Sequence, residues 1–254
     1  MSSQAKIFVL NNKTEAQPPC QSCMKRGVCP VLQLIGSSAE STATMLTYRS
    51  NETVVEANEA FKGLYMVRSG FFKSSFIDAS GEMQVTGFHL PGDLFGIEGI
   101  DNDAYGDTVT ALDTGSVCRI PLSVFSADNS SSADPMLTLV KLMSGAISRD
   151  RNMIFNLGRM HAKRRFATFL LDVSTRMQRS GYSAESFRLP MSRIDIANYL
   201  CLALETISRL FSQLHAQNII AVDRREIRII DRDALQALAD DTALEGPAQR
   251  RKAG

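Results

Sequence analysis

Between residues 192 and 217, hydrophobic positions recur at the three- and four-residue spacing of amphipathic helices. Ser192 and Asp195 have the spacing of a capping box, which predicts the start of a first short helix. A tight turn over residues 200–203 then leads to a second helix over residues 204–217. The positions that we expect to face the core are Ile194, Ala197 and Leu200 in the first helix, and Leu204, Ile207, Leu210, Phe211 and Leu214 in the second.

This spacing leaves three polar side chains together on the outer face of the second helix. Glu205, Ser208 and Arg209 stand at positions i, i+3 and i+4, which are neighbours on a helix surface. An acceptor, a hydroxyl and a guanidinium in this arrangement suit the base edges of a DNA major groove. The alternative is an ordinary helical hairpin with a solvated Glu–Arg pair.

The segment after these helices favours DNA binding. Apolar residues over 219–222 and 227–230 enclose a polar turn, residues 223–226, that carries two arginines. This pattern predicts a β-hairpin with a basic tip. Two helices followed by such a hairpin make a winged helix-turn-helix.

The first half of the chain has a different pattern. Short β-type segments alternate with turns that contain glycine or proline over about residues 45–125. The candidate strands are residues 53–55, 63–67, 71–77, 84–90 and 116–120. Short strands at such even spacing are typical of a small antiparallel barrel or jelly roll.

A long helix is predicted over residues 135–158, because Asp134-Pro135 is a typical start signal. Its seam repeats at alternating spacings of four and three residues, as in a coiled coil. The seam consists of Met136, Val140, Met143, Ile147, Asp150, Ile154 and Leu157. The stripe that can pack on the helix's own domain consists of Leu139, Leu142, Ala146 and Met153. The seam is then left for a second copy of the chain, with a dimer interface at Met143, Ile147, Asp150 and Ile154.

One position of this seam, Asp150, is charged. In a parallel homodimer the two Asp150 carboxylates would lie near each other, and close like charges at low dielectric cost about 1 kcal/mol or more. We therefore expect a marginal dimer, whose stability a signal elsewhere in the chain can change.

These patterns predict an α+β chain with five parts. They are an N-terminal cysteine segment (1–30), an antiparallel β-barrel or jelly roll (31–134), a dimerisation helix (135–158), a winged helix-turn-helix (159–240) and a flexible tail (241–254). The hydrophobic content of 44% fits a globular protein, and no apolar run is long enough to span a membrane. Because the N-terminus does not resemble a signal peptide, we expect the chain in the cytoplasm.

The net charge of +1 conceals an asymmetry between the two halves. Residues 159–254 carry 16 Lys and Arg against 11 Asp and Glu, whereas residues 1–158 carry 12 against 16. A basic C-terminal half matches contact with phosphate groups there, and the acidic N-terminal half argues against DNA contact elsewhere.

Three of the five cysteines, Cys20, Cys23 and Cys29, form the spacing C-x2-C-x5-C. One loop with this spacing can offer several thiolates to a single soft metal centre. Zinc sites normally add a second close pair of ligands, which is lacking here because the three histidines are scattered. A fourth thiolate would have to come from Cys118 or Cys201. The loop is too polar to bury free thiols well, so we favour a metal or iron–sulfur site.

Taken together, these features resemble the Crp/Fnr family of transcription regulators, and within it the oxygen-responsive FNR/ANR-like branch. The resemblance runs from Cys20 to about residue 240. Besides the cysteine cluster, it is carried by residues 86–94 (TGFHLPGDL), 142–145 (LMSG) and 205–209 (ETISR).

The resemblance implies an oxygen sensor that binds a labile [4Fe–4S] cluster. By this match, Cys20, Cys23, Cys29 and Cys118 are the cluster ligands, and Cys201 is a small turn residue. Without oxygen the cluster would stabilise the dimer, and oxygen would destroy the cluster and weaken DNA binding.

The resemblance also implies a non-enzymatic homodimer that activates anaerobic genes. It would bind double-stranded DNA at an inverted repeat of TTGAT-like half-sites, with Arg209 on a guanine and Glu205 accepting from a base amino group. Ser208 completes the matching motif. Exposed barrel loops such as residues 78–84 would contact RNA polymerase.

One departure from the wider family concerns its ligand. Relatives that bind cyclic nucleotides carry an Arg-Ser pair where the phosphate docks, whereas the corresponding residues 99–107 are acidic and contain no arginine. We therefore do not expect cAMP to bind. The sequence does not support a redox enzyme, because it contains no nucleotide-binding motif and no set of residues arranged for acid–base catalysis. A regulator with zinc on the same thiols, indifferent to oxygen, stays open from the sequence alone.

Overall fold

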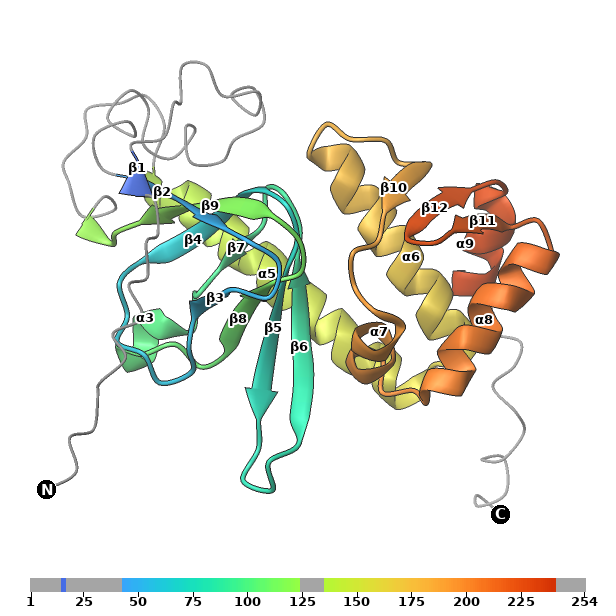
Figure 1. Cartoon of the computed structure of the whole chain (residues 1–254), viewed down its shortest axis with the longest axis horizontal. Coiled ribbons are helices and arrows are strands. Elements are labelled where there is room, and N and C mark those ends of the chain that lie inside the picture. The colour runs from blue at the N-terminus through green and yellow to red at the C-terminus, as the bar shows by residue number, and fades with distance from the viewer. Residues whose placement is uncertain (1–14, 17–42, 124–134, 241–254) are drawn as a thin grey trace, which may run out of the picture.

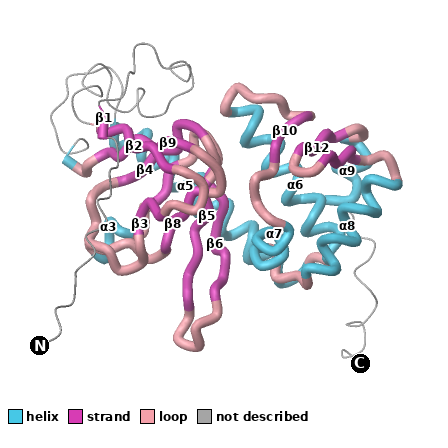
Figure 2. Tube along the Cα trace, in the orientation of Figure 1, coloured by secondary structure: helices cyan, strands magenta, loops and turns pink. Residues whose placement is uncertain are grey.

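The computed structural model describes residues 15–16, 43–123 and 135–240. A strand-rich body and a helix-rich body lie side by side, and one long helix connects them (Figures 1 and 2). The predicted flexible tail from residue 241 lies outside the described residues. In the described part of the chain, no helix is both long and apolar enough to cross a membrane.

The strand-rich body is built from two antiparallel sheets. One sheet has the order β1 (Glu15–Ala16), β2 (Thr44–Tyr48), β9 (Gly115–Ile120), β4 (Leu64–Ser69) and β7 (Leu94–Phe95). The other has the order β3 (Thr53–Val55), β8 (Thr108–Ala111), β5 (Phe72–Ile77) and β6 (Met83–His89). A short helix, α3 (Gly99–Asn102), follows β7. The core between the sheets includes Tyr48, Tyr65, Phe72, Phe95 and Val117.

This architecture confirms the predicted antiparallel barrel or jelly roll. Four strands, β1, β2, β7 and β8, carry too weak a pattern to be predicted. β1 and β7 have only two residues each and cannot alternate. β8 reads Thr-Val-Thr-Ala with small apolar residues, and β2 places two apolar residues next to each other. Their pairing partners, which lie far away in the sequence, make them strands.

The long helix α5 (Pro135–Arg159) packs one stripe on the outer face of the first sheet. Leu139 is buried there, and Leu142 and Met143 pack against the same apolar cluster. Farther along, Met153 packs against the core that the two bodies share. The helix therefore packs on its own domain through the predicted second stripe.

The helix-rich body contains the predicted winged helix-turn-helix. Its elements are α6 (Ala162–Arg179), β10 (Ser186–Arg188), α7 (Arg193–Tyr199), α8 (Leu204–Ala216), β11 (Ile220–Asp223), β12 (Glu226–Ile229) and α9 (Arg232–Asp240). The wing is a three-stranded antiparallel sheet with the order β10-β12-β11. The two bodies share a core, because Phe88 and Leu90 of the strand-rich body belong to the same cluster as Phe166 and Leu170 of α6.

Two predicted core positions in the helix-turn-helix are wrong. Ile194 is 63% exposed, and Ile196 is buried in its place. The reason is that Asp195, next to Ile194, turns inward to meet Lys73 of β5 at 2.5 Å. Leu204 is 39% exposed because it is the first residue of α8 and precedes the turns that pack on the core.

His89, at the end of β6, is half-buried, and its ring has a polar and an aromatic partner. Its Nε2 atom lies 2.7 Å from Ser74 Oγ, and its ring centroid lies 5.0 Å from that of Phe95. Burial lowers the pKa of His89 to about 4 with help from the nearby cations Arg176 and Arg149, while Asp93 opposes this shift. The imidazole is therefore neutral at pH 7.

We predict that His89 makes the free energy of unfolding depend on pH. The unfolded chain binds a proton at the ordinary pKa of 6.5, whereas the folded protein binds it only near 4, so stability falls as the pH decreases through this window. At about pH 5 the loss is about 2 kcal/mol. Urea unfolding at about pH 7.5 and pH 5 should show a smaller loss for His89→Gln, which keeps a hydrogen-bond partner for Ser74. An equal loss in both proteins would contradict this prediction.

Candidate functional site

Helix α8 presents the predicted recognition residues on its outer side. The residues that hold the helix on its domain are Ile207, Leu210, Phe211 and Leu214. Glu205 and Arg209 are exposed, and Ser208 is half-buried between them. The helix itself lies at the outer surface of the helix-rich body (Figure 1). The predicted DNA-binding residues thus lie on one accessible turn, and their contact with bases stays a prediction.

Helix α7 is fixed at its start by polar contacts, and a turn residue with a positive φ follows its end. Ser192 Oγ accepts from the Asp195 backbone N–H at 3.0 Å, and Asp195 Oδ2 accepts from the Ser192 backbone N–H at 3.0 Å. This is the predicted capping box. Cys201 follows α7 with a φ of +50°, in the left-handed region that favours glycine. It is exposed and fits the role of a turn residue.

A contact from α6 that the sequence does not reveal also fixes this turn. Arg165 donates to the Leu200 carbonyl at 2.8 Å and to the Met160 carbonyl at 2.9 Å. The neighbouring Arg164 donates to the Ala239 carbonyl at 2.8 Å. Both arginines therefore brace the domain internally, although in the sequence they resemble part of a basic patch.

Other arginines near α8 are exposed. Arg224 and Arg225 form the tip between β11 and β12, and Arg224 adopts a φ of +54°. Arg193, the first residue of α7, lies with its Cζ atom 5.1 Å from the ring centroid of Phe211 on α8. The sequence pattern predicts the wing tip but gives no signal for Arg193, because its proximity to α8 depends on the tertiary fold.

Cys118 lies on β9 and is 8% exposed. It pairs with Met45 of β2 on one side and Met66 of β4 on the other, and Met45 in turn pairs with Ala16 of β1. Residues directly opposite each other in an antiparallel sheet point to the same face. This face is covered by α5, because Cys118 and Leu139 belong to one buried cluster.

The other predicted metal ligands, Cys20, Cys23 and Cys29, lie outside the described residues. Within the described ranges, no group of three or more His, Cys, Asp or Glu side chains could hold a metal ion. Of the two remaining cysteines, Cys118 is buried on the jelly roll and Cys201 is exposed on the helix-turn-helix.

Helix α5 carries a long exposed apolar stripe. The stripe consists of Met136, Leu137, Val140, Ile147, Ile154 and Phe155. Of the predicted interface residues, Ile147 is 63% and Ile154 is 71% exposed. Met143 instead packs partly against the cluster around Cys118. Asp150 is exposed and also borders a cavity.

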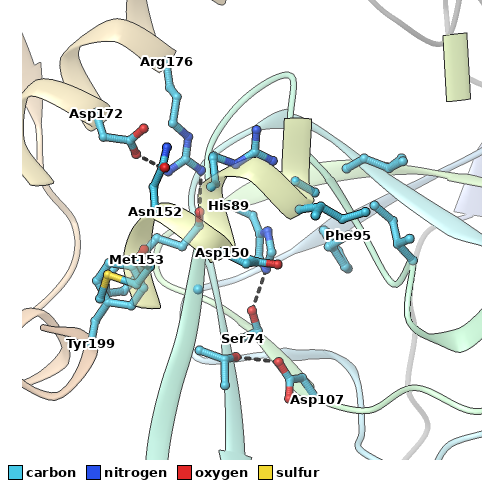
Figure 3. Close-up of a pocket in the computed structure, with 18 of the residues that line it drawn as sticks. Ser74, His89, Phe95, Asp107, Asp150, Asn152, Met153, Asp172, Arg176 and Tyr199 are labelled. Atoms are coloured by element: carbon cyan, nitrogen blue, oxygen red, sulfur yellow. Dashed lines mark hydrogen bonds and ion pairs between the residues drawn. The ribbon is translucent and has the colours of Figure 1, made fainter. Parts of the chain in front are cut away.

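This cavity, of about 500 Å³, lies between the strand-rich body, α5 and the helix-rich body (Figure 3). On its jelly-roll side, Thr86 Oγ1 donates to Asp107 Oδ2 at 2.5 Å. On the α6 side, Arg176 forms ion pairs with Asp93 and with Asp172, the latter at 3.0 Å. The guanidinium of Arg176 is therefore already engaged by two carboxylates.

Three carboxylates, Glu98, Asp107 and Asp150, line one part of the cavity. Burial raises the pKa of Glu98, and the charges of Asp107 and Asp150 raise it further. Burial also raises the pKa of Asp150, with Asp107 adding to this effect and Arg149 opposing it. This part of the cavity wall is therefore acidic, and of its three carboxylates Asp107 belongs to the acidic stretch 99–107.

Two protein families match the chain. A Crp-like helix-turn-helix domain matches residues 164–238, which span α6 to α9. A cyclic nucleotide-binding domain matches residues 45–127, which span the strand-rich body.

Relatives also match the chain along most of its length. The transcriptional activator protein FnrA of Stutzerimonas stutzeri is 36% identical over 89% of this chain and 95% of its own. The fumarate and nitrate reduction regulatory protein of Escherichia coli is 36% identical over 88% of this chain and 91% of its own. Among solved structures, FixK2 from Bradyrhizobium japonicum has a TM-score of 0.69 at 33% identity, and the match covers 78% of this chain and 97% of that one. This chain therefore belongs to the Crp/Fnr family of DNA-binding transcription regulators, and its relatives include transcriptional activators of the FNR/ANR type.

Proposed function

We propose that this regulator senses oxygen through a [4Fe–4S] cluster held by Cys20, Cys23, Cys29 and Cys118. With the cluster in place, the chain would dimerise through α5 and activate transcription from DNA sites with two half-sites. Loss of the cluster in oxygen would weaken the dimer and DNA binding.

The register of the first sheet is the observation that carries this proposal. Ala16 stands two strands away from Cys118 on the same rung, a distance of about 10 Å for adjacent strands spaced by about 4.8 Å. Four extended residues reach about 13 Å, so Cys20 can reach the Cys118 side of the sheet. The length of chain between Ala16 and Cys20 is therefore compatible with a ligand set that includes Cys118.

The donor chemistry also fits the cluster. Four thiolates are the usual ligands of a [4Fe–4S] centre, which supplies a site that reacts with oxygen. Cys118 contributes its side chain from a buried, apolar environment beside Leu64, Met66 and Leu139. Such an apolar environment limits the access of water to a metal bound at Cys118.

Contact with α5 offers a route from the cysteines to the dimer. Cys118 and Leu139 belong to one cluster, against which Leu142 and Met143 also pack. Ordering of the cysteine segment at this face would hold the first turns of α5 in one position. The exposed stripe from Met136 to Phe155 is on the same helix, so its alignment with a second copy would depend on that position.

Asp150 stands at the edge of this stripe and works against the dimer. It would approach Asp150 of the partner subunit, and it already faces the carboxylates of Glu98 and Asp107 across the cavity. Close carboxylates repel one another unless one is protonated. A dimer that carries this repulsion is marginal, which suits a protein whose assembly responds to a signal.

In the dimer, the two α8 helices would enter successive major grooves about 34 Å apart. Arg209 would donate to a guanine through two N–H groups, and Glu205 would accept from a base amino group, with Ser208 between them. The expected site is an inverted repeat of TTGAT-like half-sites. Arg224 and Arg225 at the wing tip would add sequence-independent phosphate contacts.

The β5–β6 hairpin is the surface that we assign to RNA polymerase. It projects from the strand-rich body (Figure 1), and its tip spans residues 78–84. Near the tip, Phe76, Ile77 and Met83 are exposed. Exposed apolar residues with a polar rim are typical of protein contact sites.

A cyclic nucleotide is disfavoured as the signal. Its phosphate would approach the wall formed by Glu98, Asp107 and Asp150, and repulsion between like charges opposes this. Arg176 on the far side is already paired with Asp93 and Asp172.

We predict that protein purified without oxygen contains about four iron and four sulfide per chain. When air is admitted, the visible absorption should bleach while sedimentation shows dimers dissociating. Cys118→Ser and Cys23→Ser should each lose the iron, whereas Cys201→Ser, the matched control, should retain it. Zinc in place of iron, with a dimer that persists in air, would identify a constitutive regulator and contradict oxygen sensing.

We predict that Asp150→Ala strengthens the dimer in air. Removing one carboxylate per chain relieves repulsion of about 1 kcal/mol, so the dimer dissociation constant should fall about fivefold. Asp101→Ala, which removes an exposed charge from α3, is the control. Unchanged sedimentation of Asp150→Ala would exclude Asp150 as a control point.

We predict that Arg209→Lys weakens base discrimination more than total affinity. Lysine keeps the charge but loses the planar pair of donors, so the preference for guanine over other bases should fall by about 1–3 kcal/mol. Fluorescence anisotropy with duplexes substituted at the guanine measures this preference. Arg225→Lys on the wing should leave the preference unchanged, and an equal effect of both variants would refute the assignment of Arg209.

A further inference from the structure

The four-stranded sheet ends at β6, whose outer edge meets the helix-turn-helix. Strand β6 pairs with β5 on one side and has no further strand on the other in the described sheet. A free strand edge presents unpaired N–H and C=O groups, which proteins normally cover. Here the cover is α7, the first helix of the DNA-binding unit.

The side chain of Asn198 replaces the missing strand. Its Oδ1 atom accepts from the Val85 backbone N–H at 2.5 Å, and its Nδ2 atom donates to the Met83 carbonyl at 2.8 Å. Gln84 Nε2 adds a bond to the Asn198 carbonyl at 2.9 Å. A carboxamide offers the same donor and acceptor as a peptide group, so Asn198 binds β6 as another strand would.

Two further contacts hold α7 on the same sheet, one from β5 and one from β6. Lys73 of β5 pairs with Asp195 of α7 at 2.5 Å, and their side chains are only 18% and 11% exposed. The rings of Phe88 and Tyr199 meet edge to face with their centroids 5.0 Å apart. An amide pair, a largely buried ion pair and an aromatic contact therefore lie along one short helix.

The covalent link between the two bodies is short, and it constrains their relative orientation less than these contacts do. Helix α5 ends at Arg159 and α6 begins at Ala162, so residues 160–161 alone join the dimerisation helix to the DNA-binding unit. In a linker of this kind a small change of backbone angle swings α8 through a large arc. Because Glu205 and Arg209 remain exposed in the docked arrangement, docking orients the recognition face and does not cover it.

We propose that Asn198 and Lys73 are positioning residues, which set the orientation of α8 and therefore the spacing of half-sites that the dimer accepts. This inference rests on DNA binding by a dimer, which is part of the proposed function. It adds that the strand-rich body, through the edge of β6, fixes the angle between the dimer axis and each α8 helix.

Two substitutions distinguish a positioning role of Asn198 and Lys73 from a general contribution to the stability of the protein. Asn198→Asp keeps the size and the acceptor but places an anion opposite the Met83 carbonyl. Lys73→Met removes the charge and leaves the Ser192–Asp195 capping box intact. The matched controls are Asn102→Asp on α3 and Lys62→Met. The second breaks an ion pair with Glu59 at the surface of the strand-rich body.

Binding should be measured with anaerobically prepared full-length protein and three duplexes. They are an inverted repeat of TTGAT half-sites at the spacing that the wild type prefers, the same repeat lengthened by one base pair, and a single half-site. We expect each test variant to bind the preferred repeat about tenfold more weakly, a typical coupling between sites. Its preference between the two spacings should shrink, and its affinity for the single half-site should not change.

X-ray scattering of the protein without DNA gives a second readout that does not depend on the proposed DNA site. The test variants should have a larger radius of gyration than the wild type and the controls, because the helix-rich body undocks. An unchanged radius, or an unchanged spacing preference, overturns the inference. If the wild type itself ignores the TTGAT repeat, the assigned base contacts fail, and the scattering comparison still decides whether these residues dock α7.

Discussion

Helix α5 carries two apolar stripes on one rigid rod, of which only one is buried in the described part of the chain, and the other parts of the molecule depend on this constraint. The stripe around Leu139 is buried with Cys118 on the outer face of the jelly roll. The stripe that includes Ile147 and Ile154 stays exposed. Because a helix transmits displacement along its axis with little bending, any rearrangement beside Cys118 also changes how the exposed stripe is presented. One element thereby connects the face around Cys118, the exposed apolar stripe and the link to α6.

Local patterns in the sequence were sufficient wherever local chemistry decides the structure. The capping box at Ser192, four of the five predicted buried positions of α8 and the wing follow from spacing and turn residues, and the structure contains them. The strand β7 and the inward turn of Asp195 escape such patterns, because a distant partner determines each of them. For the candidate site, the sequence identifies Glu205 and Arg209, but the bracing role of Arg165 depends on the Leu200 carbonyl, which only the tertiary fold brings close.

The cavity between the two bodies illustrates how a fold can persist while its chemistry changes. The family's cyclic nucleotide-binding domain matches the strand-rich body, and a space of ligand size remains beside α5. Its wall, however, carries Glu98, Asp107 and Asp150, and the pKa values of Glu98 and Asp150 are raised by burial. In this chain the part of the cavity next to α5 therefore collects carboxylates, while Arg149, Arg165 and Arg176 line the same cavity.

Strand β1 consists of two residues, Glu15 and Ala16, at the outer edge of the first sheet. So short a strand forms few backbone hydrogen bonds, each with a net contribution of about 1 kcal/mol. Its attachment is therefore cheap to reverse, and β1 can leave the sheet without unfolding the jelly roll. The consequence is that this edge of the sheet can open and close at low cost, while the pairing of β2 with β9 stays intact.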